Sequence, residues 1–244
     1  MAPPRGPACR DGPWPTGPEG EGGGAMNRVV PGQARVLVVG PHRDDEAIGC
    51  GGTICRHADC GDVVEVVHLT GLGGATLAEA REAGRRLGVS DISTLSGPAT
   101  QITADPALLT ELVAVFRRFR PDIVYAPHPG EDDPAHRVTA DLVREARWLS
   151  AYPLLPEAGT PLAEPVGTVY EFEVWTPMAR PSVFVDITAV RDRKADALAA
   201  YSSQLAHNEW IEGALGLNRY RGVTSGHGEF VEAFTAARTA HACF

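Results

Sequence analysis

A histidine and three acidic residues stand where the first predicted strand of the chain ends. Residues 36–53 read VLVVGPHRDDEAIGCGGT, so His42, Asp44, Asp45 and Glu46 directly follow a short apolar run. A histidine with clustered carboxylates suits a divalent metal such as zinc, and open α/β sheets bind ligands at the carboxyl ends of their strands. A run of surface acids is the simpler explanation, but such runs seldom follow a buried strand directly. We therefore predict a metal site here.

A catalytic zinc ion needs three protein ligands and one open position. His42 and Asp45 lie three residues apart at a predicted strand-to-helix junction, so both can reach one ion. His136, in the segment HPGEDDPAH, is the best candidate for the third ligand. It follows another predicted strand and opens a helix, which places it at the same edge of the sheet. His128, at the end of that strand, is the alternative third ligand.

Asp44 lies beside the predicted ligands without being one of them. A carboxylate in that position can accept a proton from water that the metal activates, and the metal lowers the pKa of that water towards about 7. Such a site is equipped for hydroxide attack on a carbonyl, most simply that of an amide. The structural alternative is that Asp44 caps the helix that follows it. Glu46 is expected to stabilise the start of the same helix through its dipole.

Alternating strand and helix patterns must position these residues. Repeated units of this kind imply a parallel sheet with helices on both faces. We predict strands at 35–40, 63–70 and 122–126, and helices from 45 to about 58, at 77–87, at 106–119 and from 134 or 135 to 149. Further along we predict a loop at 151–168, strands at 169–175 and 182–187, a helix from 188 or 192 to 207, and an irregular stretch over the site in the last thirty residues.

The length and composition limit the class of protein. The 244 residues are 43% hydrophobic and 22% charged, as expected of a globular protein, and no apolar run approaches the roughly 20 residues of a membrane span. The net charge of −9 argues against nucleic acid as the main partner. The chain has an odd number of cysteines, which argues against a disulfide framework. We therefore interpret them as packing residues: Cys9, Cys50, Cys55, Cys60 and Cys243.

The first 33 residues differ in composition from the rest. They are rich in proline, glycine and alanine, so we predict a disordered extension at 1–33 and a single domain at 34–244. The extension lacks the apolar core of a secretory signal, which favours a cytoplasmic location. Met26 follows a glycine run just before the first strand and is a candidate for the start codon.

The motif PHRDDEAIGCGGT resembles the PHPDDE-type signature of PIG-L (LmbE-like) zinc N-deacetylases. HPGEDDPAHRVTADLV is similar to that family's second metal segment, and VYEFEVWTP, FVDIT and KADALAAYSSQ resemble its distal segments. The resemblance implies a Rossmann-like three-layer α/β/α fold with a mostly parallel sheet. It implies one zinc ion per chain, held by His42, Asp45 and His136, with Asp44 as general base. It also implies removal of an N-acyl group, usually acetyl, from an amino sugar or a glucosamine-containing conjugate, as in antibiotic or small-thiol metabolism.

The chain departs from the family pattern at three positions. Arg43 replaces a proline, and we expect its side chain to face solvent, with contact to a substrate anion as the alternative. Asp133 stands where the family has a histidine near the leaving amine and the oxyanion, and Ala135 replaces an aspartate that orients it. Asp133 could act as a catalytic acid only if its pKa were raised.

Other groups could take over that task. His128 is close in sequence, and His227 lies in a glycine-rich segment. Tyr125, at the end of its strand, could offer its hydroxyl to the oxyanion. The alternative function is a family member that keeps the metal, has lost or altered its catalysis, and acts as a binding or regulatory protein. A nucleotide site at the glycines of 49–52 is disfavoured, because the preceding acids repel phosphate and no GxGxxG follows a strand.

Overall fold

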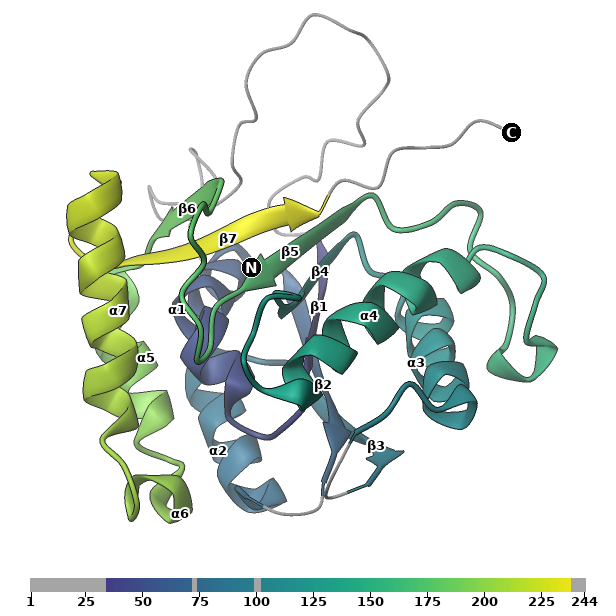
Figure 1. Cartoon of the computed structure of the whole chain (residues 1–244), viewed down its shortest axis with the longest axis horizontal. Coiled ribbons are helices and arrows are strands. Elements are labelled where there is room, and N and C mark those ends of the chain that lie inside the picture. The colour runs from purple at the N-terminus through teal and green to yellow at the C-terminus, as the bar shows by residue number, and fades with distance from the viewer. Residues whose placement is uncertain (1–33, 72–73, 99–101, 238–244) are drawn as a thin grey trace, which may run out of the picture.

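The computed structural model describes residues 34–71, 74–98 and 102–237 of the chain. Within these ranges seven strands form one sheet, and helices cover both of its faces (Figure 1). The strands are β1 (Arg35–Gly40), β2 (Val63–Thr70), β3 (Asp91–Gly97), β4 (Ile123–Pro127), β5 (Thr168–Phe172), β6 (Val183–Asp186) and β7 (Val231–Ala237). The helices are α1 (Asp45–Cys60), α2 (Leu77–Leu87), α3 (Pro106–Phe119), α4 (Pro134–Leu149), α5 (Arg191–Leu198), α6 (Ser202–Leu205) and α7 (Trp210–Ser225), with short 3-10 helices η2 (Pro156–Ala158) and η3 (Thr188–Val190).

The predicted three-layer fold with a mostly parallel sheet is confirmed. The strand order is β3-β2-β1-β4-β5-β7-β6, and the first five strands pair in parallel. β7 lies antiparallel between β5 and β6. Helices α1, α2, α5 and α7 lie on one side of the sheet, and α3 and α4 lie on the other (Figure 1).

The order of the strands explains where a ligand would bind. Strands β2 and β3 lie on one side of β1, whereas β4 and β5 lie on its other side. The carboxyl ends of β1 and β4 therefore flank the point at which the direction of strand addition reverses, and open α/β sheets bind ligands at such a point. His42 follows β1 and His136 lies in the first turn of α4, so the topology brings both residues to this edge.

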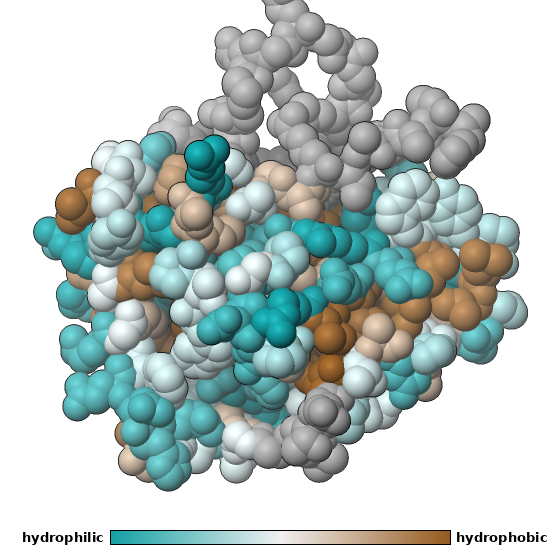
Figure 2. All heavy atoms as spheres, in the orientation of Figure 1, coloured by the Kyte–Doolittle hydropathy of each residue, from teal (hydrophilic) through white to brown (hydrophobic). Residues whose placement is uncertain are grey.

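The sheet is buried on both faces, which accounts for the unbroken apolar run of β1. Val36 and Val38 belong to the core on the α1 side, and Leu37 and Val39 belong to the core on the α3 side. Successive side chains of a strand point to opposite faces, so one short run supplies both cores. The outer face seen in Figure 2 is mainly hydrophilic, with apolar residues in small groups.

Helix α1 is broken at Cys50, where φ is −141° and ψ is 20°. The glycines around the break allow close packing. A Cβ atom on Gly49 would lie 2.2 Å from Phe172, and one on Gly52 would lie 2.6 Å from Ile187. The helix was predicted despite these glycines, and the structure shows that they let α1 press against the sheet and the segment after β6.

The prediction for the last part of the chain was wrong. The expected irregular stretch overlaps the sixteen-residue helix α7 and contains the strand β7, and β3 was not predicted at all. The helix predicted up to 207 ends at Leu198, and a separate short helix α6 follows. The loop at 151–168 is confirmed apart from η2, and β5 ends at Phe172 rather than at 175.

Some predictions concern residues that the structure does not describe. The extension at 1–33 and the candidate start Met26 lie outside the described residues, and the single domain at 34–244 stays a prediction. No helix in the described ranges combines the length and apolar character that crossing a bilayer requires.

Candidate metal centre and active site

The three predicted ligands His42, Asp45 and His136 meet at the carboxyl edge of the sheet. Each offers one ligand atom, and these atoms all lie within 4.8 Å of one another. The Asp45 carboxylate lies between the two imidazoles. Its Oδ2 is 3.4 Å from Nδ1 of His42 and its Oδ1 is 3.3 Å from Nε2 of His136. Residues separated by more than ninety positions in sequence thus form one compact group.

The unpartnered atoms of this group fit a bound cation. Oδ1 of Asp45 and Nε2 of His136 are buried and make no hydrogen bond. Buried polar atoms usually have a partner, so orphans of this kind need an explanation. A divalent metal between them would be that partner, and two imidazoles with one carboxylate match the ligand set of a catalytic zinc site.

The charges of the group are strongly coupled. Burial alone would raise the pKa of Asp45, but the nearby imidazoles of His136 and His42 outweigh burial and lower it. Burial alone would lower the pKa of each histidine, but Asp45 outweighs burial and raises both. A metal ion binds neutral imidazoles, so it would compete with protons for these two histidines.

Asp44 is beside the ligands and does not cap α1 with its side chain. Only its backbone carbonyl closes the helix start, accepting from the amides of Ala47 and Ile48 at 3.0 Å each. Its φ of 155° is unusual for a residue with a side chain, and such backbone strain concentrates at functional sites. Burial, with the nearby carboxylates of Asp45 and Glu46, raises the pKa of Asp44 well above its usual value. A carboxyl group whose pKa is raised in this way is a candidate for proton transfer in catalysis.

Glu131 supports the site and was not singled out from the sequence. Its carboxylate lies 3.7 Å from Nδ1 of His136, on the side of the ring away from Asp45. The backbone amides of Val174, Trp175 and Thr176 donate to Glu131 at 2.6 to 3.2 Å and hold it in place. A carboxylate behind a metal-binding histidine orients the ring and sets its basicity. Within the acidic run GEDD, no local feature distinguishes this glutamate from its neighbours.

Comparison with known proteins identifies the family to which this chain belongs. The sequence profile described as GlcNAc-PI de-N-acetylase, or PIG-L, matches residues 37–147, a range that contains all three candidate ligands. A diacetylchitobiose deacetylase from Thermococcus kodakarensis is 31% identical over 199 residues, covering 72% of this chain and 72% of the relative. The chain belongs to the PIG-L family.

Other relatives agree on the fold but differ in reaction. The solved structure of N,N'-diacetylchitobiose deacetylase from Pyrococcus horikoshii matches this PIG-L chain with a TM-score of 0.73 and 27% identity, covering 84% of each chain. A 4-oxalmesaconate hydratase from Pseudomonas putida is 29% identical over 197 residues, covering 70% of this chain and 74% of the relative. Because similar chains carry out different reactions, the reaction has to be argued from the site.

Asp133, which stands where a histidine was expected from the family pattern, caps helix α4. Its Oδ1 accepts from the backbone amide of Ala135 at 2.7 Å. Its charge also contributes to the raised pKa of His42 and of His136, so the carboxylate lies within electrostatic reach of these two histidines. The capping hydrogen bond gives Asp133 a structural role at the start of α4.

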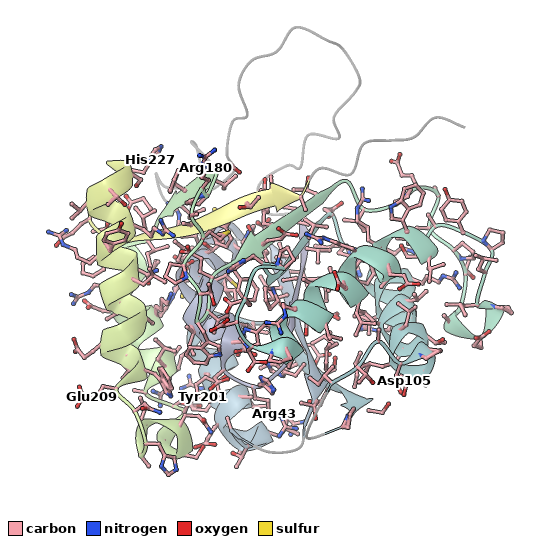
Figure 3. All side chains as sticks on the ribbon, in the orientation of Figure 1. Arg43, Asp105, Arg180, Tyr201, Glu209 and His227 are labelled. Carbon is pink, nitrogen blue, oxygen red and sulfur yellow. The ribbon has the colours of Figure 1, made fainter. Side chains whose placement is uncertain are left out.

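The structure does not bring the other candidate acids into the site. His128 accepts from the amide of Gly130 at Nδ1 and bonds the carbonyl of Thr176 at Nε2, so both ring nitrogens are used. Tyr125 is in the core, with its hydroxyl 3.0 Å from Nε2 of His57. His227 lies near Arg180 at the opposite end of the molecule from Arg43 (Figure 3).

The prediction that Arg43 faces solvent was wrong. Its guanidinium turns inward and donates to the carbonyls of Gly71 at 2.9 Å and Ala75 at 3.3 Å. Arg43 therefore joins the metal-binding loop to the segment that follows β2. The alternative of a substrate anion is not needed to explain its position.

Glu46 has a more specific role than the predicted effect on the helix dipole. It is buried, and its two carboxylate oxygens bond Nε2 of His68 at 2.9 Å and the hydroxyl of Tyr201 at 2.7 Å. Figure 3 labels Tyr201 near the start of α1. His68 therefore has a structural role, and the three side chains together fix the turn that carries Asp45.

Proposed function

We propose that this chain is a zinc-dependent N-deacetylase that hydrolyses the amide of an N-acetylated amino sugar or of a glucosamine-containing conjugate. The observation that carries the proposal is the convergence of His42, Asp45 and His136. Asp44 is next to them, and its side chain makes no capping hydrogen bond to the helix. The names of the matching family and of the chitobiose-acting relatives support the substrate class. Zinc, one ion per chain, is proposed from the ligand set. The cytoplasmic location stays a prediction.

Asp44 is assigned the proton transfers. A bound metal supplies Lewis acidity, which polarises the amide carbonyl and acidifies water. Asp44 accepts the proton of the attacking water at a carboxylate oxygen. Because its pKa is raised by burial and by Asp45, it can hold that proton and then deliver it to the leaving nitrogen. The amide C–N bond breaks, and acetate and the free amine are released.

Asp133 is assigned a contact with the leaving amine. Its carboxylate accepts a hydrogen bond from the backbone amide of Ala135, and its proposed task is to accept a second one from the substrate nitrogen. As the nitrogen gains a proton and becomes an ammonium ion, its attraction to Asp133 increases. This assignment replaces the acid role that the family pattern suggested for the position.

An acetate-release assay tests the proposal. Zinc-loaded protein is incubated with N-acetylglucosamine, diacetylchitobiose and a panel of other N-acetylglucosaminides, and its metal content is measured in the same sample. We expect acetate release, and we expect Asp44→Asn to lower kcat by at least about 100-fold while retaining zinc. Full activity of Asp44→Asn would exclude Asp44 as the base. Bound zinc without any acetate release would favour the alternative of a metal-binding protein with lost or altered catalysis.

A further inference from the structure

We call His42, Asp45 and His136 the metal group. A cavity of about 250 Å³ lies beside it, between α1, α7 and the segment that follows β5. None of the residues around it is assigned to the reaction described above. Most of them are apolar or small. The lining residues are Ile48, Gly49, Glu173, Val174, Trp175, Pro177, Trp210, Gly213, Ala214, Leu217, Asn218 and Ala233.

The cavity adjoins the metal group through two side chains. The indole of Trp175 stacks on the imidazole of His136, with ring centroids 6.2 Å apart and planes at 28°. Trp175 also contacts Trp210, with centroids 4.5 Å apart, and is 37% exposed, so solvent reaches it. Ile48 lies three residues after Asp45 and thus on the same side of α1. Trp175 thus borders both the metal group and the cavity.

The polar side chains in the lining are engaged with the protein. Glu173 forms a buried ion pair with Arg221 and accepts from the backbone amide of Met178. Asn218 accepts from Lys194 and donates to the carbonyl of Val231. What these groups leave for a ligand is mainly the apolar surface of the tryptophans and aliphatic residues.

We propose that the cavity is a subsite for an apolar group of the substrate, an alkyl or aryl group attached to the amide-bearing sugar. This inference rests on the proposed deacetylase function. The cavity has a volume of roughly 250 Å³. Sites that enclose a whole small molecule have about 300 to 1,000 Å³, so this cavity suits one part of a substrate. Each methylene group buried there increases affinity about fourfold. The apolar group belongs either to the acyl chain or to the aglycone, and the experiment separates these two sources.

Two glycines of α7 give a matched pair of variants. A Cβ atom on Gly213 or on Gly216 would meet nothing within 4 Å, so a leucine fits on the helix at either position. Gly213 lines the cavity and Gly216 does not. Gly213→Leu therefore places an aliphatic side chain at the cavity, and Gly216→Leu makes the same change outside it.

Substrate preference tests the subsite. The acyl arm compares N-hexanoylglucosamine with N-acetylglucosamine, and the aglycone arm compares 4-nitrophenyl N-acetyl-β-D-glucosaminide with N-acetylglucosamine. We expect kcat/KM to be at least about tenfold higher for the apolar substrate in one arm. Gly213→Leu should lower that preference at least about fivefold, and Gly216→Leu should leave it as in the parent. No preference in either arm, or an unchanged preference in Gly213→Leu, would overturn the proposal.

Direct binding separates this proposal from the deacetylase function. 4-Nitrophenyl β-D-glucoside and hexanoate contain no amide, and their binding is followed by the fluorescence of the cavity tryptophans. Saturable binding that weakens in Gly213→Leu but not in Gly216→Leu supports the subsite even if no amide is hydrolysed, and in that case only the deacetylase function fails. Absence of binding by both probes overturns the subsite even if acetate is released from N-acetylglucosamine.

Discussion

Lys194 and Glu232 form an ion pair of 2.7 Å from which solvent is excluded. The two side chains join the halves of the broken helix α1. The ammonium of Lys194 donates to the carbonyl of Ile48, ahead of the break at Cys50. The carboxylate of Glu232 accepts from the amides of Gly52 and Thr53, after the break, and so caps the second half. The ion pair thus replaces the backbone hydrogen bonds that an unbroken helix would make.

Removing one member of this pair should destabilise the protein strongly. We expect Lys194→Met to lower the free energy of unfolding by about 3 to 5 kcal/mol, because it leaves the Glu232 charge buried and unpaired. The double variant Lys194→Met, Glu232→Gln should lose less than the sum of the two single variants. Urea unfolding measures both effects. The exposed pair of Arg85 and Glu82 is the control, and Arg85→Ala should change the free energy of unfolding far less than Lys194→Met does.

Replacement of His136 should abolish metal binding. The ring provides one of the three ligand atoms, and a site left with two protein ligands binds zinc much more weakly. We expect His136→Ala to be purified with less than about a tenth of the zinc of the parent protein, measured by elemental analysis. His227→Ala, at the opposite end of the molecule, should keep both its zinc and its activity. Equal zinc in His136→Ala and the parent would remove His136 from the ligand set.

Two substitutions of Asp133 separate its capping role from its contact with substrate. Asparagine also caps helices well, whereas alanine does not, so Asp133→Ala alone should lose about 1 kcal/mol of stability. Both substitutions remove the charge, and we expect both to lower kcat/KM by at least about tenfold. Thermal unfolding and acetate release on the same samples provide the two measurements. Parent-like activity in Asp133→Asn would limit this residue to its capping role.

Glu79 should make the free energy of unfolding depend on pH in the acidic range. Burial opposes the shift, but hydrogen bonds from Thr76 and Ser203 lower the pKa of Glu79 from its usual 4.5 to about 2. The unfolded chain binds a proton more readily than the folded one, so this contribution is present above about pH 4.5 and is lost as the pH falls towards 2. Glu79 is partly exposed, so the effect should be modest. Urea unfolding at pH 5 and pH 3 should show a smaller acid loss for Glu79→Gln than for the parent, and equal losses would contradict the assignment.

The elements that sequence patterns predicted are those with strong periodicity or long apolar runs. β1 and β4 are buried on both faces and read as apolar runs, and β2 is mostly buried and mostly apolar. β3 has the sequence DISTLSG and is largely half-buried, so its polar residues resemble a loop. α7 contains three glycines and little separation of apolar and polar faces, and it becomes a helix because tertiary packing against β7 and α5 stabilises it.

The candidate site was predicted in part for a similar physical reason. His42 and Asp45 are close in sequence, and the parallel topology indicated that His136 would join them. The roles of Glu131, Tyr201 and Trp175 depend on contacts between segments far apart in sequence. The inward turn of Arg43 depends on the carbonyls of the segment after β2, and a local pattern carries no information about such contacts.

The position of β7 has a consequence for the synthesis of the chain. Within the described sheet, β6 is hydrogen-bonded only to β7, which is the last strand to be made. Glu232 also belongs to β7, so until it leaves the ribosome Lys194 has no counter-ion and the second half of α1 lacks its cap. A nascent chain that stops before residue 231 therefore contains all three candidate ligands, while the helix that begins at Asp45 still lacks the cap of its second half.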